Sequence, residues 1–210
     1  MDAIEALDQG AYAHFTFQAK AMPNVVSVMV TAYYISSYIG VCVLIIGILG
    51  IHLFLNRKQS ALVATLSLVS AILIIELLRF AVPRSRPQDA VQWIGDEAKS
   101  GTFPSASVFL FLLCMILLGN ALWENLSARW SRGVFIVLAA SLTVWVCLSQ
   151  FYLALHYVSD VIGAITGATL IGWIAIRLIS AAAPPRPAEA SDAPPADAIQ
   201  DLARATAIKK

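Results

Sequence analysis

A histidine and an aspartate stand four residues apart in the last third of the chain, as His156 and Asp160 in the run LHYVSDVIG. Residues at i and i+4 of a helix share a face, so the carboxylate can accept a hydrogen bond from one ring nitrogen. The other nitrogen is then free to act as a nucleophile or a base. Because ionisable groups are costly beside a membrane-spanning stretch, the pair is a candidate functional site. A structural pair, in which each group only satisfies the other, is the alternative.

Further polar residues stand at the ends of the neighbouring apolar stretches. They are Arg79 and Arg86, Ser105 and Ser107, and Ser149 and Gln150. Arginine presents a planar fork that matches phosphate oxygens, and the start of a helix offers unpaired N–H groups and the positive end of the helix dipole. If the helix ends meet at one membrane face, these residues form an anion site beside His156.

The composition is that of an integral membrane protein. Of the 210 residues, 59% are hydrophobic and only 13% are charged, and the mean hydropathy is +0.76. Stretches of about 20 apolar residues predict five spans, at roughly 33–55, 60–82, 104–123, 133–153 and 156–179. No alternation of period two competes with them, so we expect an all-α, polytopic transmembrane helix bundle and not a barrel.

Three regions are predicted along the chain. Residues 1–32 mix acids with spaced apolar residues, which favours an amphipathic helix at the membrane interface and not a cleaved signal peptide. Residues 33–179 form the transmembrane domain. Residues 180–210 are rich in Ala and Pro, which predicts a disordered tail, although a short helix over 196–209 is compatible with the sequence.

Basic residues predict the orientation. Those beside one set of short loops are Arg57, Lys58, Arg129, Arg132 and Arg177, and the tail adds more. The positive-inside rule places this side and the tail in the cytoplasm, so the candidate site faces the extracytoplasmic side of the cytoplasmic membrane. Membrane lipids are the expected surroundings, and no basic cluster with interleaved aromatics indicates nucleic acid. The oligomeric state is not predicted.

The three cysteines are expected to be small buried hydrophobes. Cys42, Cys114 and Cys147 fall inside apolar spans without a paired spacing. We therefore expect neither redox chemistry nor a metal site.

The order and spacing of the polar residues resemble the type 2 phosphatidic acid phosphatase and vanadium haloperoxidase superfamily. The boxes of that family are Lys-x6-Arg-Pro, Pro-Ser-Gly-His and Ser-Arg-x5-His-x3-Asp. The matching residues are Arg79, Arg86 and Pro87, then Pro104, Ser105, Ala106 and Ser107, then Ser149, Gln150, His156 and Asp160. The resemblance covers about residues 60–178 and belongs to the membrane branch of the family.

The resemblance implies a phosphohistidine mechanism without a metal or other cofactor. The residue matching His156 attacks phosphorus, and the residue matching Asp160 orients it. Those matching Arg79, Arg86 and Ser105 hold the phosphoryl oxygens. The implied substrates are lipid phosphates and polyprenyl diphosphates, which makes the chain a phosphoric ester or anhydride hydrolase or phosphotransferase.

Two functional side chains of the family are missing. Ser107 stands where the family has the histidine that protonates the leaving group, and Gln150 stands where it has an arginine. Ser107 and Gln150 remain candidate phosphate-binding residues. The loss predicts a preference for diphosphates, whose phosphate leaving group has a second pKa of about 6. The alternative is a catalytically impaired relative that binds lipid phosphate or acts as a membrane scaffold.

Three nearby ionisable residues are considered as compensation. Arg84 either supplies the missing cation or is a solvated loop charge. His14, in the N-terminal segment, either folds over the site as an acid or is a solvated surface histidine. Glu76, one turn before Arg79, is expected to form an i,i+3 ion pair that steadies Arg79, and proton donation by Glu76 is the alternative.

Overall fold

A computed structural model describes residues 3–87, 101–123, 125–126 and 128–182. In this part of the chain there are seven helices and no strands. The helices are α1 (Ala3–Ala21), α2 (Pro23–Ser36), α3 (Tyr38–Phe54), α4 (Lys58–Ala81), α6 (Ala106–Leu122), α7 (Arg129–Tyr152) and α8 (Val158–Ala182). The predicted tail beyond residue 182, with its short helix, lies outside the described residues.

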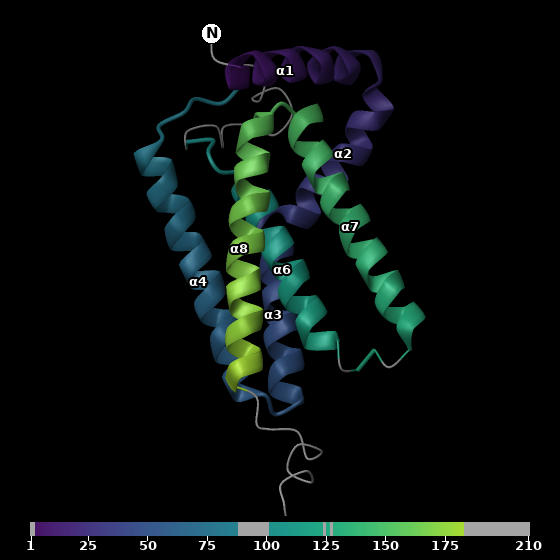
Figure 1. Cartoon of the computed structure of the whole chain (residues 1–210). Helices are drawn as coiled ribbons and strands as arrows, with labels where there is room; N and C mark the ends of the chain where they lie inside the picture. The colour runs from purple at the N-terminus through teal and green to yellow at the C-terminus, as the bar shows by residue number, and fades with distance from the viewer. Residues whose placement is uncertain (1–2, 88–100, 124, 127, 183–210) are drawn as a thin grey trace, which may run out of the picture.

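The helices form a bundle that α1 crosses at one end (Figure 1). By length and composition α4, α7 and α8 can each cross a membrane, and α2 and α3 together can form a fourth, bent span. The third predicted span, 104–123, corresponds to α6, which is apolar but shorter, with 17 residues. The all-α transmembrane fold is therefore confirmed.

The first predicted span, 33–55, is wrong in its start and in its continuity. The helical path begins at Pro23, so the predicted boundary between residues 32 and 33 falls inside α2, and α2 meets α3 at an angle of 47°. Ser37 is extended at the break, and its Oγ donates to the Tyr34 carbonyl over 2.6 Å. A β-carbon at Gly40 would collide with the Ile35 carbonyl. Serine hydroxyls that bond back to their own helix often bend it, and here they accompany a full break.

Helix α6 lies at the centre of the bundle and packs against α8. Inside a membrane, helices associate through close packing more than through a hydrophobic force, so small residues mark the contact. Gly163 and Gly167 meet the rings of Phe103 and Phe109, and Ala164 and the other small residues Ala168 and Ala175 are fully buried. Gly163 and Gly167, which form a GxxxG pattern in α8, therefore make a close contact inside the bundle.

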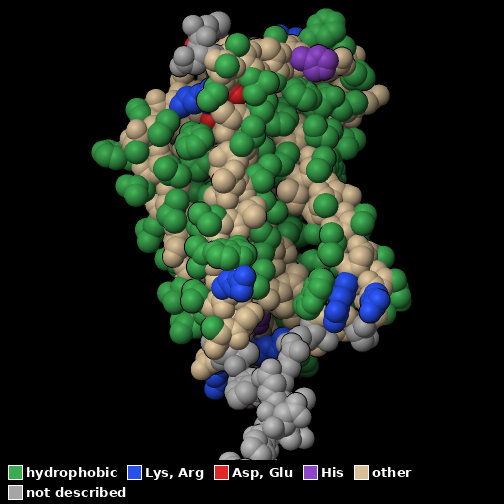
Figure 2. All heavy atoms as spheres, in the orientation of Figure 1, with side chains coloured by type: hydrophobic (Ala, Val, Ile, Leu, Met, Phe, Trp, Pro, Cys, Tyr) green, Lys and Arg blue, Asp and Glu red, His purple; other side chains and the backbone are tan. Residues whose placement is uncertain are grey.

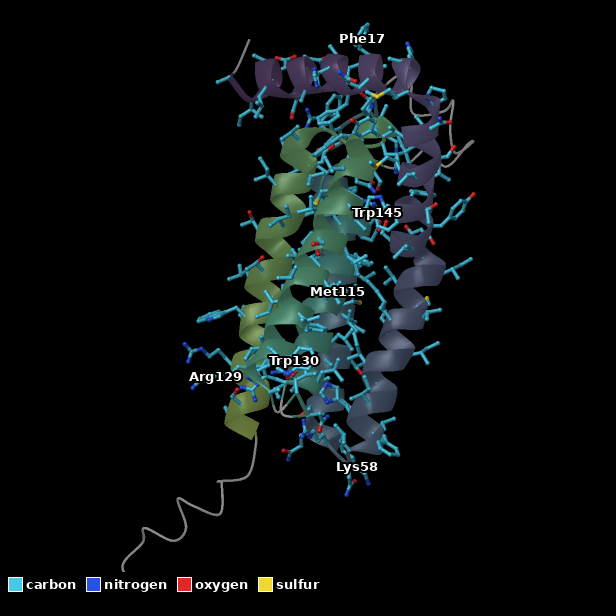
Figure 3. The ribbon with its side chains drawn as sticks, turned by 90° about the vertical axis from the view of Figure 1, so that its right-hand side faces the viewer. Phe17, Lys58, Met115, Arg129, Trp130 and Trp145 are labelled. Carbon is cyan, nitrogen blue, oxygen red and sulfur yellow. The ribbon has the colours of Figure 1, made fainter. Side chains whose placement is uncertain are left out.

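The flank of the bundle is suited to lipid. Hydrophobic side chains cover the face in Figure 2, and Lys and Arg gather towards the end opposite α1. Lys58, Arg129 and Trp130 lie at that end, whereas Phe17 of α1 lies at the other (Figure 3). The exposed surface of α3 includes Cys42, which corrects its predicted burial. The chain is an integral membrane protein, and basic side chains are concentrated at the end of the bundle opposite α1 (Figure 2).

The α6–α8 contact gives a test of the packing. We expect Gly167→Ala to lower stability by about 1–3 kcal/mol, because its new methyl group would collide with the buried ring of Phe109. For a protein of this size that is a fall of several °C in the melting temperature in detergent.

Gly133→Ala on α7 is the matched control, because nothing lies within 4 Å of its β-carbon position. Alanine is also the better helix former, so its melting temperature should stay level or rise. Equal melting temperatures for the two variants would contradict close packing at Gly167.

Candidate active site

His156 is held at the polar end of the bundle by the turn that joins α7 to α8. The Ala154 N–H donates to the Phe151 carbonyl and the Leu155 N–H to the Gln150 carbonyl, which is the hydrogen-bond pattern of a Schellman motif. Ala154 occupies the left-handed position of that motif, with φ of 54°. Glycine is the usual residue there, and alanine costs about 1–2 kcal/mol. The turn reverses the chain and leaves His156 buried just before α8.

Asp160 lies in the first turn of α8 and accepts a hydrogen bond from the Tyr157 N–H over 3.0 Å. The Val161 N–H bonds to the Tyr157 carbonyl, so Tyr157 is the N-cap and Asp160 reaches back to it, as in one half of a capping box. The same oxygen, Oδ2, lies 3.7 Å from His156 Nδ1. His156 was expected on the helix with Asp160, but α8 begins at Val158, so the turn before the helix sets their approach.

The surroundings of His156 keep its imidazole neutral. Burial lowers the pKa of His156, and the nearby charges of Arg86 and Arg79 lower it further, against the opposing effect of Asp160. A neutral ring has a lone pair available for attack. A contact of 3.7 Å is longer than a hydrogen bond, and such contacts tighten when a substrate binds.

Arg79 lies in the last turn of α4 and forms the predicted ion pair with Glu76, with Nη1 and Oε1 3.0 Å apart. The Arg79 side chain is nearly buried, whereas Glu76 is exposed. The Arg79 Nε atom is buried and has no hydrogen-bond partner among the described residues. Glu76 therefore steadies one part of the guanidinium and leaves another part able to bind an anion.

Ser105 stands at the N-cap of α6, and its N–H donates to the Asp160 carbonyl over 3.2 Å. That bond joins the start of α6 to the start of α8. The first hydrogen bond of α6 runs from the Phe109 N–H to the Ser105 carbonyl. The N–H groups of the residues before Phe109 therefore have no acceptor within the helix. The Ser105 hydroxyl is buried without a partner within the described chain. A buried polar group of this kind calls for a ligand or water.

The two residues that depart from the family boxes lie beside this group. Ser107 is half-buried in the first turn of α6. Gln150 is fully buried near the end of α7. Both hydrogen bonds that the Gln150 Nε2 atom donates stay within α7, to the Val146 carbonyl over 3.4 Å and to the Ser149 hydroxyl over 3.1 Å. Gln150 thus supplies neither the charge nor the free donor of an arginine.

Arg84 has neither of the two roles considered for it. Its Nη1 donates to Asp160 Oδ1 over 3.1 Å and to the Ser159 hydroxyl over 2.6 Å. Its Nη2 donates to Asp8 Oδ2 over 2.6 Å, and its guanidinium stacks on Tyr157, 4.1 Å from the ring centroid. Arg84 is therefore a structural cation that binds two carboxylates, and not a solvated charge or an evident phosphate ligand.

The acid that α1 brings to this group is Asp8, which sequence reasoning assigned only to the interfacial segment. His14, the residue considered on this helix, is exposed and meets Phe15 edge-on, with ring centroids 5.5 Å apart. Burial would raise the pKa of Asp8, but hydrogen bonds from Ser159 and Arg84 outweigh it and lower the pKa. No local pattern marks Asp8, because its partners are more than 70 residues away in sequence.

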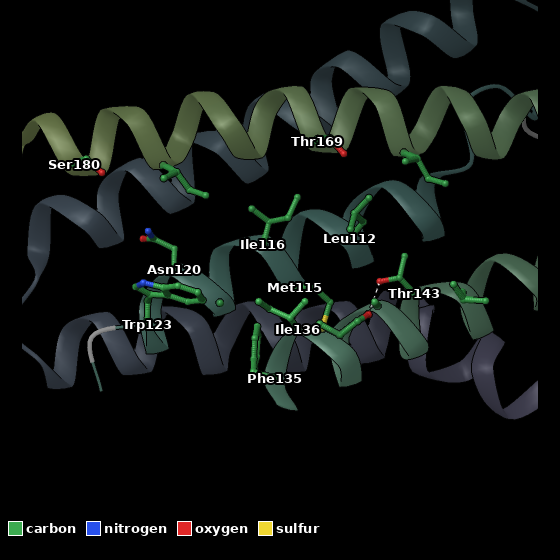
Figure 4. A pocket seen from close by; sticks show the side chains of 16 residues that line it. Leu112, Met115, Ile116, Asn120, Trp123, Phe135, Ile136, Thr143, Thr169 and Ser180 are labelled. Carbon is green, nitrogen blue, oxygen red and sulfur yellow. Dashed lines mark hydrogen bonds between the residues drawn. The ribbon is translucent and has the colours of Figure 1, made fainter. Parts of the chain in front are cut away.

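No group of three or more His, Cys, Asp or Glu side chains that could hold a metal ion occurs within the described ranges. A pocket of about 800 Å³ lies away from His156, between α6, α7 and α8 (Figure 4). Apolar side chains such as Leu112, Met115 and Phe135 dominate its lining, with Asn120 and Trp123 nearer one end. It holds no set of groups suited to phosphoryl chemistry.

Comparison with known proteins assigns the fold and the family. The sequence model of the PAP2 superfamily matches residues 60–184. The chain belongs to the PAP2 superfamily. The match spans α4 to α8 and so includes every residue of the candidate site except Asp8.

A solved structure supports the PAP2 assignment. It is described as the first transmembrane PAP2 type phosphatidylglycerolphosphate phosphatase from Bacillus subtilis. The similarity has a TM-score of 0.76 at 21% identity, and covers 89% of this chain and 90% of that one. At this identity the likeness establishes the fold. None of the curated protein sequences matches the chain.

Arg84 gives a test of the buried charges. We expect Arg84→Gln to lower stability by about 3 kcal/mol, because the carboxylates of Asp8 and Asp160 are fully buried and lose their shared cation. The melting temperature near pH 7 should fall by roughly 6–12 °C. Arg177→Gln is the control, because Arg177 is exposed on α8 and stacks on Trp173.

The pH dependence of this loss has a defined sign. The pKa of Asp8 is lowered from 3.8 in the fold, so its pairing stabilises the protein above that pH and the contribution disappears as pH falls through the lower value. The difference between wild type and Arg84→Gln should shrink in acid. A difference that is small at pH 7, or that grows in acid, would contradict the pairing.

Proposed function

We propose that this chain is a membrane phosphatase or phosphotransferase that acts on lipid phosphates through a phosphohistidine at His156. The observation that carries the proposal is the surroundings of the imidazole. His156 is buried, Asp160 lies 3.7 Å from its Nδ1, and the charges of Arg79 and Arg86 act on it. A neutral nucleophile beside two cations is suited to attack on a phosphoryl group.

In the proposed reaction, Nε2 of His156 attacks phosphorus. The new P–N bond forms as the P–O bond to the leaving group breaks, and Asp160 supports the Nδ1–H that carries the developing positive charge. Arg79, Arg86 and the Ser105 hydroxyl balance the charge on the phosphoryl oxygens. Water then attacks the phosphohistidine: a P–O bond forms as the P–N bond breaks, the proton that water loses passes to the solvent, phosphate is released, and the free imidazole is regenerated.

The residue at position 107 indicates which leaving group the site can expel, because Ser107 stands where the family has a proton-donating histidine. Ser107 is no general acid near neutral pH, and a missing acid costs about 10²–10⁴ in rate. An alkoxide is a base about as strong as hydroxide, from water of pKa about 15.7, and needs the proton. A phosphate leaving group has a second pKa of about 6 and departs without it. A diphosphate carried by a lipid, such as a polyprenyl diphosphate, is the substrate that fits.

We also propose that the site faces the extracytoplasmic side of the cytoplasmic membrane, with the tail in the cytoplasm. Arg57, Lys58, Arg129 and Arg132 border the short connections at the end opposite α1, where the positive-inside rule places the cytoplasm. Lipid can then reach the site from the outer leaflet.

One observation favours a second function, in which the protein binds lipid phosphate without cleaving it. Gln150 replaces a cation, and its Nε2 bonds only within α7. Together, Ser107 and Gln150 stand in place of the proton donor and one of the cations that assist turnover in the family. Retention of a buried His156 with its Asp160 favours the enzyme, because a binding pocket has no use for an oriented nucleophile.

Activity on defined lipids tests the proposal. The purified protein should release phosphate from a polyprenyl diphosphate faster than from phosphatidic acid, and His156→Ala should abolish release. Faster cleavage of phosphatidic acid would contradict the leaving-group argument. No release from either lipid, with tight binding of both, would establish the binding protein.

Restoring the missing acid gives an independent prediction. Ser107→His should raise kcat on phosphatidic acid by about 100-fold or more and change kcat on the diphosphate little. The double variant Ser107→His, Gln150→Arg should in addition lower KM for both lipids, because a third cation enters the site. Equal gains on both substrates from Ser107→His alone would show that the leaving group does not limit the wild type.

A further inference from the structure

Helix α1 buries an acid in a stretch where neighbouring apolar residues are exposed. The Asp8 side chain is fully buried, whereas Ile4 and Leu7, on the same stretch of helix, are 64% and 55% exposed. An interfacial helix that only rests on lipid has no reason to bury a carboxylate, which is costly unless it is paired. The burial therefore points to a role for Asp8 at the end of the bundle.

Asp8 caps α8 from a distant part of the chain. Its Oδ1 accepts the Ser159 N–H over 2.9 Å, and its Oδ2 accepts the Ser159 hydroxyl over 2.6 Å. Tyr157, the N-cap of α8, has no short side-chain oxygen to cover these N–H groups. A carboxylate at the start of a helix is also favoured by the helix dipole. Asp8 thus fixes the first turn of α8, the turn that carries Asp160.

The same carboxylate shares Arg84 with Asp160. One nitrogen of the guanidinium bonds to Asp8 over 2.6 Å and the other to Asp160 over 3.1 Å. Two carboxylates and one guanidinium leave one net negative charge. If Asp8 were absent, Arg84 would pair with Asp160 alone and neutralise the acid that faces His156.

We infer that Asp8 is a positioning residue of the reaction, which orients Asp160 and preserves its negative charge towards His156 by holding both Arg84 and the start of α8. The inference rests on the proposed function. It makes α1 a part of the active site, and it extends that site beyond residues 60–184, the segment that matches the family.

Groups from several elements face His156 and set its protonation. Asp160 of α8 favours the protonated ring, and Arg79 of α4 and Arg86 of the following segment oppose it. Removing the charge of Asp8 makes these surroundings more positive. The pH below which His156 becomes protonated and kcat/KM falls should therefore move lower, a shift that lost stability alone would not produce.

Asp8→Asn tests this role because it keeps the shape and one acceptor for the Ser159 N–H while removing the charge. We expect kcat on the diphosphate substrate to fall about 10–100-fold with a smaller change in KM, and the acid limb of the kcat/KM profile to move to lower pH. Glu5→Gln, which removes an exposed acid from the same helix, should change neither.

A double-mutant cycle asks whether Asp8 acts through Arg84. In an Arg84→Gln background, Asp8→Asn should cost much less in kcat than in the wild type. Assays run well below the melting temperature of each variant keep folding losses out of the rates. An unchanged kcat and an unmoved acid limb in Asp8→Asn, with an active wild type, would overturn the inference. An inactive wild type would overturn the proposed function, and the positioning role with it.

Discussion

The arrangement of the polar end of this bundle depends on one buried ionic group, in which Arg84 binds Asp8 and Asp160 together. Both carboxylates are fully buried, so each needs a partner, and the single guanidinium joins helices that are far apart in sequence. Such a group is a poor source of stability compared with apolar packing, but it is strongly destabilising to break. It fixes where α8 begins and how Asp160 faces His156. The site therefore depends on an interaction whose main effect is position.

The apolar packing of the helices restricts how the side chains at the polar end can be arranged. Helix α6 sits against the small residues of α8, which brings Ser105 to the start of α8 and bonds its N–H to the Asp160 carbonyl. The turn after α7 buries His156 beside these groups. Burial lowers the pKa of His156, and the charges of Arg86, in the segment after α4, and of Arg79 in α4 lower it further. Apolar packing and the buried ionic group together bring these polar side chains to one end of the bundle.

Much of this was predictable from local sequence. Apolar runs gave α4, α6, α7 and α8 to within a few residues, and motif spacing gave the family. The sequence failed where the cause is not local. The left-handed Ala154 has no glycine to mark it, and Asp8 finds Ser159 at a separation of 151 residues. A charge in an amphipathic segment is usually solvated, so nothing nearby distinguished Asp8 from Glu5.

The central claim is that His156, held by this buried group, attacks phosphorus directly. The most direct measurement is an alkaline quench of the protein during turnover of a lipid diphosphate labelled in its terminal phosphate, followed by peptide mapping. Phosphohistidine survives alkali and is lost in acid. The account predicts an alkali-stable, acid-labile phosphate on the peptide that contains His156. Steady release of labelled phosphate with no label on that peptide, at times that resolve a single turnover, would contradict it.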